Sequence, residues 1–153
     1  MRGVYRVLAG LVALGVVVQA SSMVYAVAGL GKYVDDGGTF DKAAGEAMID
    51  GDISFAGAGG FALHGIDGMM VIPLLALLLL IVSFFAKVPG GVRMAAILFG
   101  LVALQIFLGI FSHSIPFVVV LHVLNAFAIL GLSLQAGRSA TVVREPAQPS
   151  VAA

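Results

Sequence analysis

The chain has 153 residues, of which 61% are hydrophobic and only 10% are charged, and its mean hydropathy is +1.13. Soluble domains are about 45–50% apolar and about 25% charged, so this composition excludes an ordinary soluble protein. It indicates an integral membrane protein, with the lipid bilayer as its partner. The net charge is zero and no basic run occurs, so we expect no nucleic-acid partner. The absence of cysteine excludes disulfides, iron–sulfur clusters and covalent haem attachment, which leaves histidine, methionine or oxygen as ligands for any metal or cofactor.

The first apolar run covers residues 7–31 and follows Arg2 and Arg6. It is long enough to cross about 30 Å of hydrocarbon at 1.5 Å per residue. The alternative is a secretory signal peptide, with residues 1–26 removed. Because the apolar core of a signal peptide runs to about 15 residues, we interpret this run as the first transmembrane helix.

An acidic loop, residues 32–60, separates the first span from the second. Thr39 predicts the N-cap of a short surface helix that ends near Met48. A solvated connector is the simpler interpretation of this loop and a partner-binding lid is the alternative, since loops of this length are often functional or disordered. The acidic residues of the loop are Asp35, Asp36, Asp41, Glu46, Asp50 and Asp52.

Three further apolar runs complete the predicted membrane domain, residues 1–137: the runs are residues 61–86, 94–112 and 115–136. Pro73 predicts a kink in the second span. The polar tail, residues 138–153, predicts disorder. The sequence therefore predicts an all-α membrane protein, a four-transmembrane-helix bundle built from two tandem helical hairpins.

Basic residues predict how this bundle is oriented. Most of them fall on one side of the predicted membrane, and the acidic loop falls on the other. The positive-inside rule then places both termini in the cytoplasm, in a multi-pass protein of the cell inner (plasma) membrane. The residues that carry this argument are Arg2, Arg6, Lys87, Arg93, Arg138 and Arg144.

Two short patterns recur and predict an internal repeat. The sequence GLVAL occupies residues 10–14 and again residues 100–104, and the pattern LHxx[D/N] occurs around His64 and around His122. Two hairpins in the same orientation would be related by an axis along the membrane normal, a parallel repeat. This arrangement brings His64 and His122 to matching depths, about 5–10 Å below the outer surface.

Paired intramembrane histidines favour a metal or cofactor site, because polar groups in hydrocarbon are costly and commonly functional. Neutral imidazole binds iron, copper and zinc. Two such ligands, His64 and His122, from facing helices of a bundle form the usual axial pair of a b-type haem. Candidates to hydrogen-bond the imidazoles or the haem propionates are Asp67, Asn125, Gln19 and Gln105. Small residues that would admit a flat macrocycle are Gly65, Gly68 and Ala126.

Two alternatives stay open at this site. His113 together with His64 and His122 could form a copper or zinc site, or each histidine could be a buried structural group without a ligand. A methionine could replace one histidine as an axial ligand, although methionine in an apolar helix usually serves packing; the candidates are Met23, Met69 and Met70.

The motifs resemble those of the haem A synthase family. Residues 105–109 (QIFLG), a turn and then LH at His122 resemble one hairpin of that family, and His64 matches its other histidine position. The family has eight helices in two four-helix halves, and this chain, over about residues 7–135, resembles one half. It also resembles a family of small four-helix bacterial membrane proteins of unknown function that share HxxxG and LHxxN motifs.

One departure from haem A synthase bears on catalysis. The family's first histidine lies in an ExxHR pattern, whereas Phe61 and Gly65 occupy the glutamate and arginine positions here. The resemblance thus implies the fold and the haem ligands rather than the oxidation chemistry, and whether the protein is an enzyme is left open. We expect a haem b protein that transfers electrons with a quinone or redox protein; the alternative is a cofactor-free membrane subunit. A homodimer would rebuild eight helices.

Overall fold

The computed structural model describes residues 1–112 and 114–141, and in these residues all regular secondary structure is helical, without a strand. Four helical segments are long and apolar enough to cross a membrane, which confirms the predicted four-helix membrane bundle. Three consecutive elements, α3, η1 and α4, form one continuous span, Gly59–Ala86. The elements are α1 (Arg2–Asp35), α2 (Lys42–Asp50), α3 (Gly59–Ile66), the π-helix η1 (Asp67–Val71), α4 (Ile72–Ala86), α5 (Gly91–Ser112) and α6 (Val118–Ser139).

The helices extend beyond the spans expected from the apolar runs, because backbone hydrogen bonding continues past the hydrocarbon into polar sequence. α1 ends at Asp35 rather than near residue 31, and α6 continues to Ser139 rather than ending at residue 136. At its other end α6 begins three residues later than the expected residue 115, at Val118. Asp41, and not Thr39, caps α2: its carboxylate accepts a hydrogen bond from the Ala44 N–H at 2.9 Å. The expected disorder of the tail lies, from residue 142 onward, outside the described residues.

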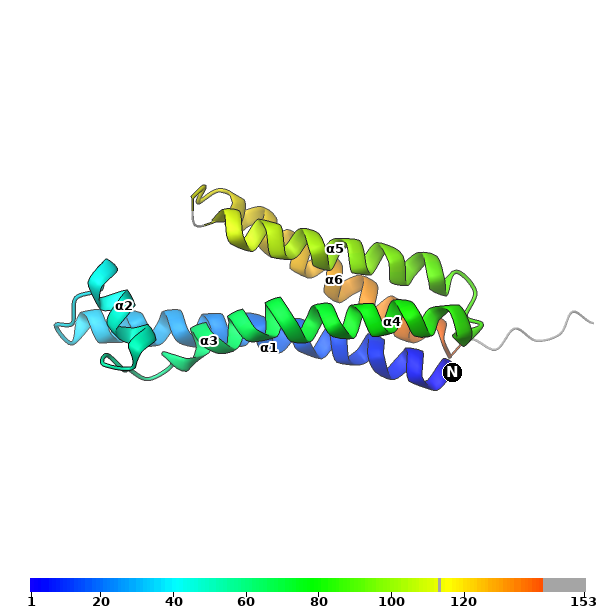
Figure 1. The fold of residues 1–153 in the computed structure, drawn as a ribbon, viewed down its shortest axis with the longest axis horizontal. Coiled ribbons are helices and arrows are strands. Elements are labelled where there is room, and N and C mark those ends of the chain that lie inside the picture. Colours follow the sequence, from blue (N-terminus) through cyan, green and yellow to red (C-terminus); the bar gives the residue numbers. More distant parts are fainter. Residues whose placement is uncertain (113, 142–153) are drawn as a thin grey trace, which may run out of the picture.

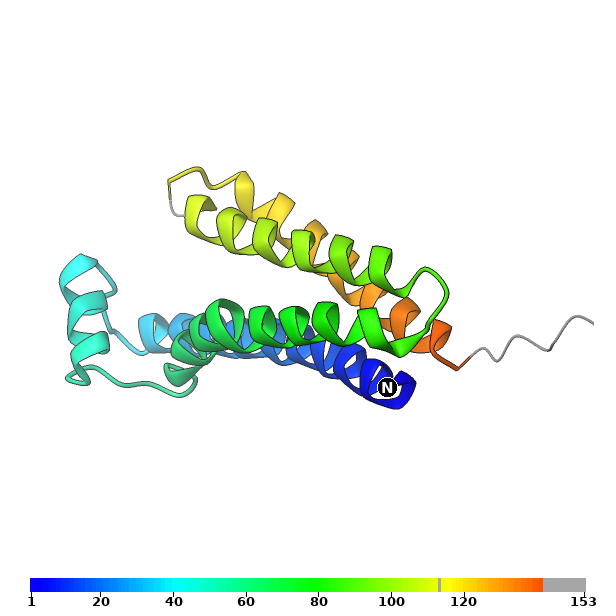
Figure 2. The same ribbon diagram turned by 45° about the vertical axis from the view of Figure 1, so that its right-hand side comes forward.

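The four spans form a closed ring of neighbours, in the order α1, α4, α5, α6. α1 and α5 lie on one diagonal, and α4 and α6 lie on the other. The start of α1 and the end of α6 lie at one end of the bundle (the termini end), and α2 lies at the other end (the α2 end) (Figure 1). The two hairpins approach each other at the termini end and diverge towards the α2 end (Figures 1 and 2).

Side-chain burial fits a bundle in lipid rather than in water. Large apolar side chains cover the outer surface; Leu74, Phe84, Phe107 and Phe127 are each more than half exposed. Polar side chains instead point inward, among them Gln19, Ser22, Asp67, Ser83, Gln105, Asn125 and Ser133. Because polar groups in hydrocarbon must find partners inside the protein, this distribution is the one expected of a membrane bundle.

The buried positions reveal the repeat and its register. Every buried residue of α5 lies 86 positions after a buried residue of α1. The pairs are Tyr5 and Gly91, Ala9 and Ala95, Val12 and Leu98, Val16 and Val102, and Gln19 and Gln105. The two GLVAL segments lie 90 positions apart and are therefore displaced by one helical turn from the structural repeat. A four-residue slip keeps apolar residues on the same face, so such a match carries little register information.

The π-helix accounts for the one irregularity of the repeat. Up to the first residue of the π-helix, corresponding residues of the two hairpins lie 58 positions apart: His64 corresponds to His122 and Asp67 to Asn125. After the π-helix, corresponding residues of α4 and α6 lie 57 positions apart. The buried pairs are then Ile72 and Ile129, Ala76 and Ser133, and Leu79 and Ala136. A π-turn inserts one residue into an α-helix, so η1 (Asp67–Val71) holds the extra residue of the first hairpin. Pro73, which lacks the N–H for the preceding turn, follows it directly.

Candidate functional site: the histidine pair

His64 and His122 lie together, near the α2 end, on two different hairpins. Their ring centres are 6.2 Å apart and their planes meet at 48°. Both side chains are half-buried. The predicted juxtaposition of the two histidines is therefore present in the structure, even though they are 58 residues apart in the chain.

Each imidazole is held by its own hairpin in the same way. His64 Nδ1 lies 3.0 Å from the Gln19 carbonyl oxygen of α1, and His122 Nδ1 lies 3.2 Å from the Gln105 carbonyl oxygen of α5. A carbonyl oxygen can only accept, so both Nδ1 atoms carry the proton and both Nε2 atoms keep a lone pair. This is the tautomer of a metal-ligating histidine whose other nitrogen is fixed by the protein.

The two glutamines contribute to the site mainly through their backbones. The sequence suggested their side-chain amides as partners for the imidazoles, but the carbonyl groups take that role. The side chains serve other contacts: Gln19 Nε2 donates to the His64 carbonyl at 3.4 Å, and Gln105 Oε1 accepts from Asn125. Gln105 Nε2 is buried and has no partner among the described residues.

Asp67 and Asn125 occupy equivalent positions, one turn after each histidine, and differ in their contacts. Asn125 Nδ2 donates to the Leu101 carbonyl at 2.9 Å and to Gln105 Oε1 at 2.7 Å. Asp67 is as buried as Asn125, yet its Oδ2 has no hydrogen-bond partner among the described residues. Its Oδ1 lies on the α1 side, near Gly15. Neither residue forms a hydrogen bond with an imidazole in the described part of the chain; Asn125 instead links α6 to α5.

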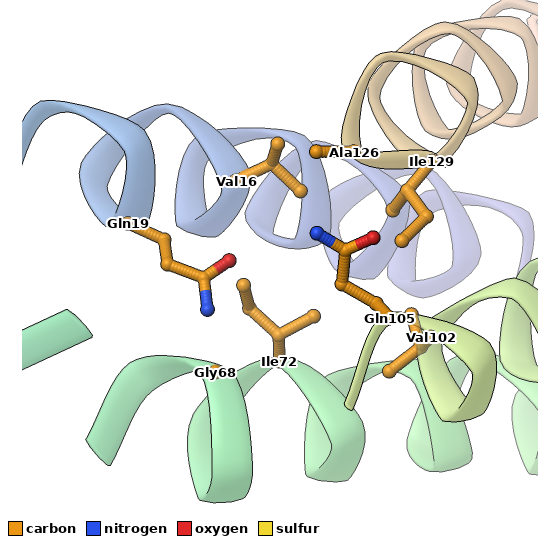
Figure 3. A pocket seen from close by; sticks show the side chains of 8 residues that line it. All are labelled: Val16, Gln19, Gly68, Ile72, Val102, Gln105, Ala126 and Ile129. Carbon is orange, nitrogen blue, oxygen red and sulfur yellow. The ribbon is translucent and has the colours of Figure 1, made fainter. Parts of the chain in front are cut away.

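A small cavity lies between the two hairpins (Figure 3). It is lined by Gly68 and Ala126, each about one helical turn after a histidine of the pair, so the cavity lies just below the histidines. Its volume is about 10 Å³, enough for about one water molecule. Paired positions line it, including Val16 and Val102, and the side chains of Gln19 and Gln105 extend towards each other across it (Figure 3). The cavity is far too small for a porphyrin, so a macrocycle would have to lie above it, between the diverging ends of the hairpins.

The small residues near the histidines differ in the space that they leave. Gly65 is exposed and has no atom within 4 Å of a built Cβ, so the surface beside His64 is open. Gly68 is covered by the Gln19 amide, and Ala126 lines the small cavity. Gly109, which the sequence analysis did not single out, lies against the His122 ring, 3.2 Å from Cε1. Only Gly65 therefore offers the open surface that a flat ligand requires.

The donor set limits which metal these residues can hold. Among residues 1–112 and 114–141 no group of three histidine or acidic side chains forms a metal-binding cluster. His113 of the three-histidine alternative lies outside the described residues. Met69 and Met70 are mostly exposed on the outer surface, away from the pair. Zinc sites use three or four protein ligands, whereas haem supplies four nitrogens of its own and requires two.

Comparison with known proteins gives no relative: no family model matches the chain, and neither a curated protein nor a solved structure matches it. The likeness to haem A synthase therefore rests on the short motifs alone, and the functional argument has to rest on the geometry of the site.

Proposed function

We propose that this protein is an integral membrane b-type haem protein in which His64 and His122 are the two axial ligands, and that it transfers electrons. One observation carries the proposal: the ring centres of two imidazoles from separate hairpins lie 6.2 Å apart, and each Nδ1 contacts a backbone carbonyl, which leaves Nε2 as the nitrogen for a metal. A metal–imidazole bond of about 2.0–2.1 Å, with the ring centre about 1.1 Å behind the nitrogen, separates two opposed ligating rings by roughly 6 Å. The observed separation of 6.2 Å agrees with that value.

The surroundings of the pair support the same interpretation. The hairpins diverge at this end (Figure 2), and Gly65 leaves the surface beside His64 open. The carbonyls of Gln19 and Gln105 orient the rings before any ligand binds, which lowers the cost of binding. When bound, haem would supply one-electron redox chemistry, and the backbone carbonyls of Gln19 and Gln105 would hold the rings and set their tautomer.

A structural role for the histidines is the competing proposal, and the Nδ1 contacts favour it, because each stabilises a hairpin without any ligand. That role explains the contacts of each ring with its own hairpin. It gives no reason for two half-buried imidazoles of different hairpins to lie with their ring centres 6.2 Å apart. Haem oxidation chemistry is not part of the proposal, since Phe61 stands one turn before His64, where haem A synthase has a glutamate.

We further propose that the termini end is cytoplasmic and the α2 end, with the histidines, faces outward, so that electrons pass between a quinone in the bilayer and an acceptor at the outer face. The charge distribution supports this orientation: most basic residues of the described chain lie at the termini end, and at the α2 end the six acidic residues of the loop outnumber its two lysines, Lys32 and Lys42. Because the chain has no cysteine, single-cysteine variants Asp50→Cys and Lys87→Cys can be labelled with a membrane-impermeant maleimide in intact cells. Labelling of Lys87→Cys alone would contradict the orientation.

The test of haem binding is an optical spectrum of the full chain, purified in mild detergent from haem-sufficient cells, oxidised and dithionite-reduced. We expect sharp reduced bands of six-coordinate haem b with one haem per chain. His64→Ala and His122→Ala should each abolish the six-coordinate spectrum, whereas His113→Ala, the third histidine of the chain, should leave it unchanged. Colourless wild-type protein, with both variants as stable as the wild type, would overturn the proposal in favour of the structural role.

A further inference from the structure

A groove runs between α1 and α6 at the termini end, far from the histidines. Its volume is about 310 Å³, roughly ten times the share of one water molecule in the liquid. Two arginines from different helices border it, and two glycines form part of its floor. Residues that line the groove include Arg6, Gly10, Ser133, Gly137, Arg138 and Thr141.

No acidic side chain of the described residues neutralises these arginines. In that part of the chain the ion pairs are Lys32 with Asp36 and Lys42 with Glu46, both at the α2 end. Arg6 and Arg138 are both exposed, and both line the groove. The groove therefore combines two positive charges with a lining that also includes Leu134 and two glycines, which suits a ligand that has an anionic head and an apolar tail.

The repeat supplies an internal control, because the α5–α4 interface is the counterpart of the α1–α6 interface. Its residues are larger or apolar at every corresponding position. Arg6, Gly10 and Ser133 correspond to Val92, Ala96 and Ala76, and Gly137, Arg138 and Thr141 correspond to Leu80, Ile81 and Phe84. The fold thus forms the same interface without arginine, serine or glycine. We conclude that the basic, hollow groove is not a requirement of helix packing.

We propose that the groove between α1 and α6 binds an anionic phospholipid, with the phosphate between the guanidinium groups of Arg6 and Arg138 and an acyl chain along Gly10 and Gly137. Guanidinium groups bind phosphate through paired N–H donors. Basic pockets between transmembrane helices bind anionic headgroups, with about 1 kcal/mol from each basic residue near the membrane surface.

Native mass spectrometry of the full chain tests this, after incubation with equal amounts of phosphatidylglycerol and phosphatidylcholine that carry the same acyl chains. We expect the wild type to retain phosphatidylglycerol preferentially. Arg6→Gln and Arg138→Gln should each weaken that retention about fivefold, and the double variant about 25-fold. Gly137→Leu, which copies Leu80 of the other interface, should also weaken it while it leaves the charge unchanged; a built Cβ at Gly137 meets nothing closer than 4.0 Å.

Arg93→Gln is the matched control, because Arg93 is an exposed arginine at the same end of the bundle but lies on α5, outside the groove. It should retain the lipid as the wild type does. Equal retention of both lipids by the wild type, or a loss in Arg93→Gln as large as in Arg6→Gln, would overturn the proposal in favour of general attraction to a positive surface. Displacement of the lipid by millimolar inorganic phosphate would overturn it in favour of a free-anion site.

Discussion

The two hairpins of this protein share one plan and differ in how strictly they follow it. The second, α5 and α6, is regular: its helices are uninterrupted, and Asn125 donates hydrogen bonds to the Leu101 carbonyl and to Gln105 Oε1. The first, α1 with α3 to α4, has an inserted residue in η1 and a buried carboxylate, Asp67, in place of the amide. Because the histidines are held identically in both, the differences lie in what surrounds the site rather than in the site itself.

The π-helix of the first hairpin sets the position of His64 relative to the core of the bundle. π-turns are rare in proteins and occur frequently at functional sites. Here η1 begins at Asp67, directly after the turn of α3 that carries His64. The extra residue changes the register of α4 relative to α3 and so lets His64 keep the depth of His122 while the core residues of α4 and α6 stay paired. Two deletions and five substitutions test the comparison of the two hairpins.

The largest difference should come from deleting one residue in each hairpin. Met70 in η1 and Phe127 in α6 are equally exposed, at 67% and 65%, so neither loses core packing. Deletion of Met70 should convert η1 to α-helix and keep both flanking faces in register. Deletion of Phe127 should rotate Ile129 and Ser133 by about 100° from the core and prevent folding.

Thermal unfolding in detergent, followed by circular dichroism, measures both deletions. We expect the melting temperature to fall by only a few degrees for the Met70 deletion, and no cooperative transition for the Phe127 deletion. If the Met70 deletion is as damaging as the Phe127 deletion, then η1 does not hold an extra residue, and the register derived from the buried positions is wrong.

The repeat also explains which parts of the fold could be predicted from sequence. The four spans follow from hydropathy, which is a property of whole segments, and the histidine pair follows from a polar motif that is rare in apolar sequence. The register of α1 and α5 did not follow from GLVAL, because apolar residues are interchangeable within a helix face. The backbone roles of Gln19 and Gln105 left no signal in residue type, since any residue has a carbonyl group.

The next largest effect should come from Gly60, where α3 approaches α1. A Cβ there would overlap the Ser22 carbonyl oxygen and lie 3.1 Å from the Ala26 Cβ. The corresponding residue of α6 is Val118, which shows that only the first hairpin requires glycine. Gly60→Val should lower the free energy of unfolding by about 3 kcal/mol through overpacking.

Gly65→Val is the matched control for Gly60→Val, since it places the same side chain five residues later on the same helix, where a built Cβ meets no atom within 4 Å. It should change the free energy of unfolding by less than about 0.5 kcal/mol. Unfolding in mixed detergent micelles compares the two. Equal losses would mean that the approach of α3 to α1 does not determine the effect.

A smaller loss is expected from Asn125→Ala, which removes the donor to the Leu101 carbonyl and to Gln105 Oε1. Hydrogen bonds between membrane helices contribute about 0.6 kcal/mol on average and at most about 1.7 kcal/mol. We therefore expect a loss of about 1–2 kcal/mol in the same micelle assay. Asp67→Ala should cost less, because Asp67 makes no side-chain hydrogen bond in the described structure; the reverse order would contradict the assignment of Asn125 as the satisfied member of the pair.

The smallest and most specific effect is a gain from Asp67→Asn, which gives the first hairpin the residue of the second. In the second hairpin the amide donates to the carbonyl of residue 101 and to the side chain of Gln105. In the first hairpin the counterparts of Leu101 and Gln105 are Gly15, which lies close to Asp67 Oδ1, and Gln19. An amide at position 67 would supply the donor that a carboxylate lacks, so the free energy of unfolding should rise by about 0.6 kcal/mol. A loss of stability would indicate instead that Asp67 has a partner of its own, and that the two hairpins differ at this position in their contacts as well as in their residue type.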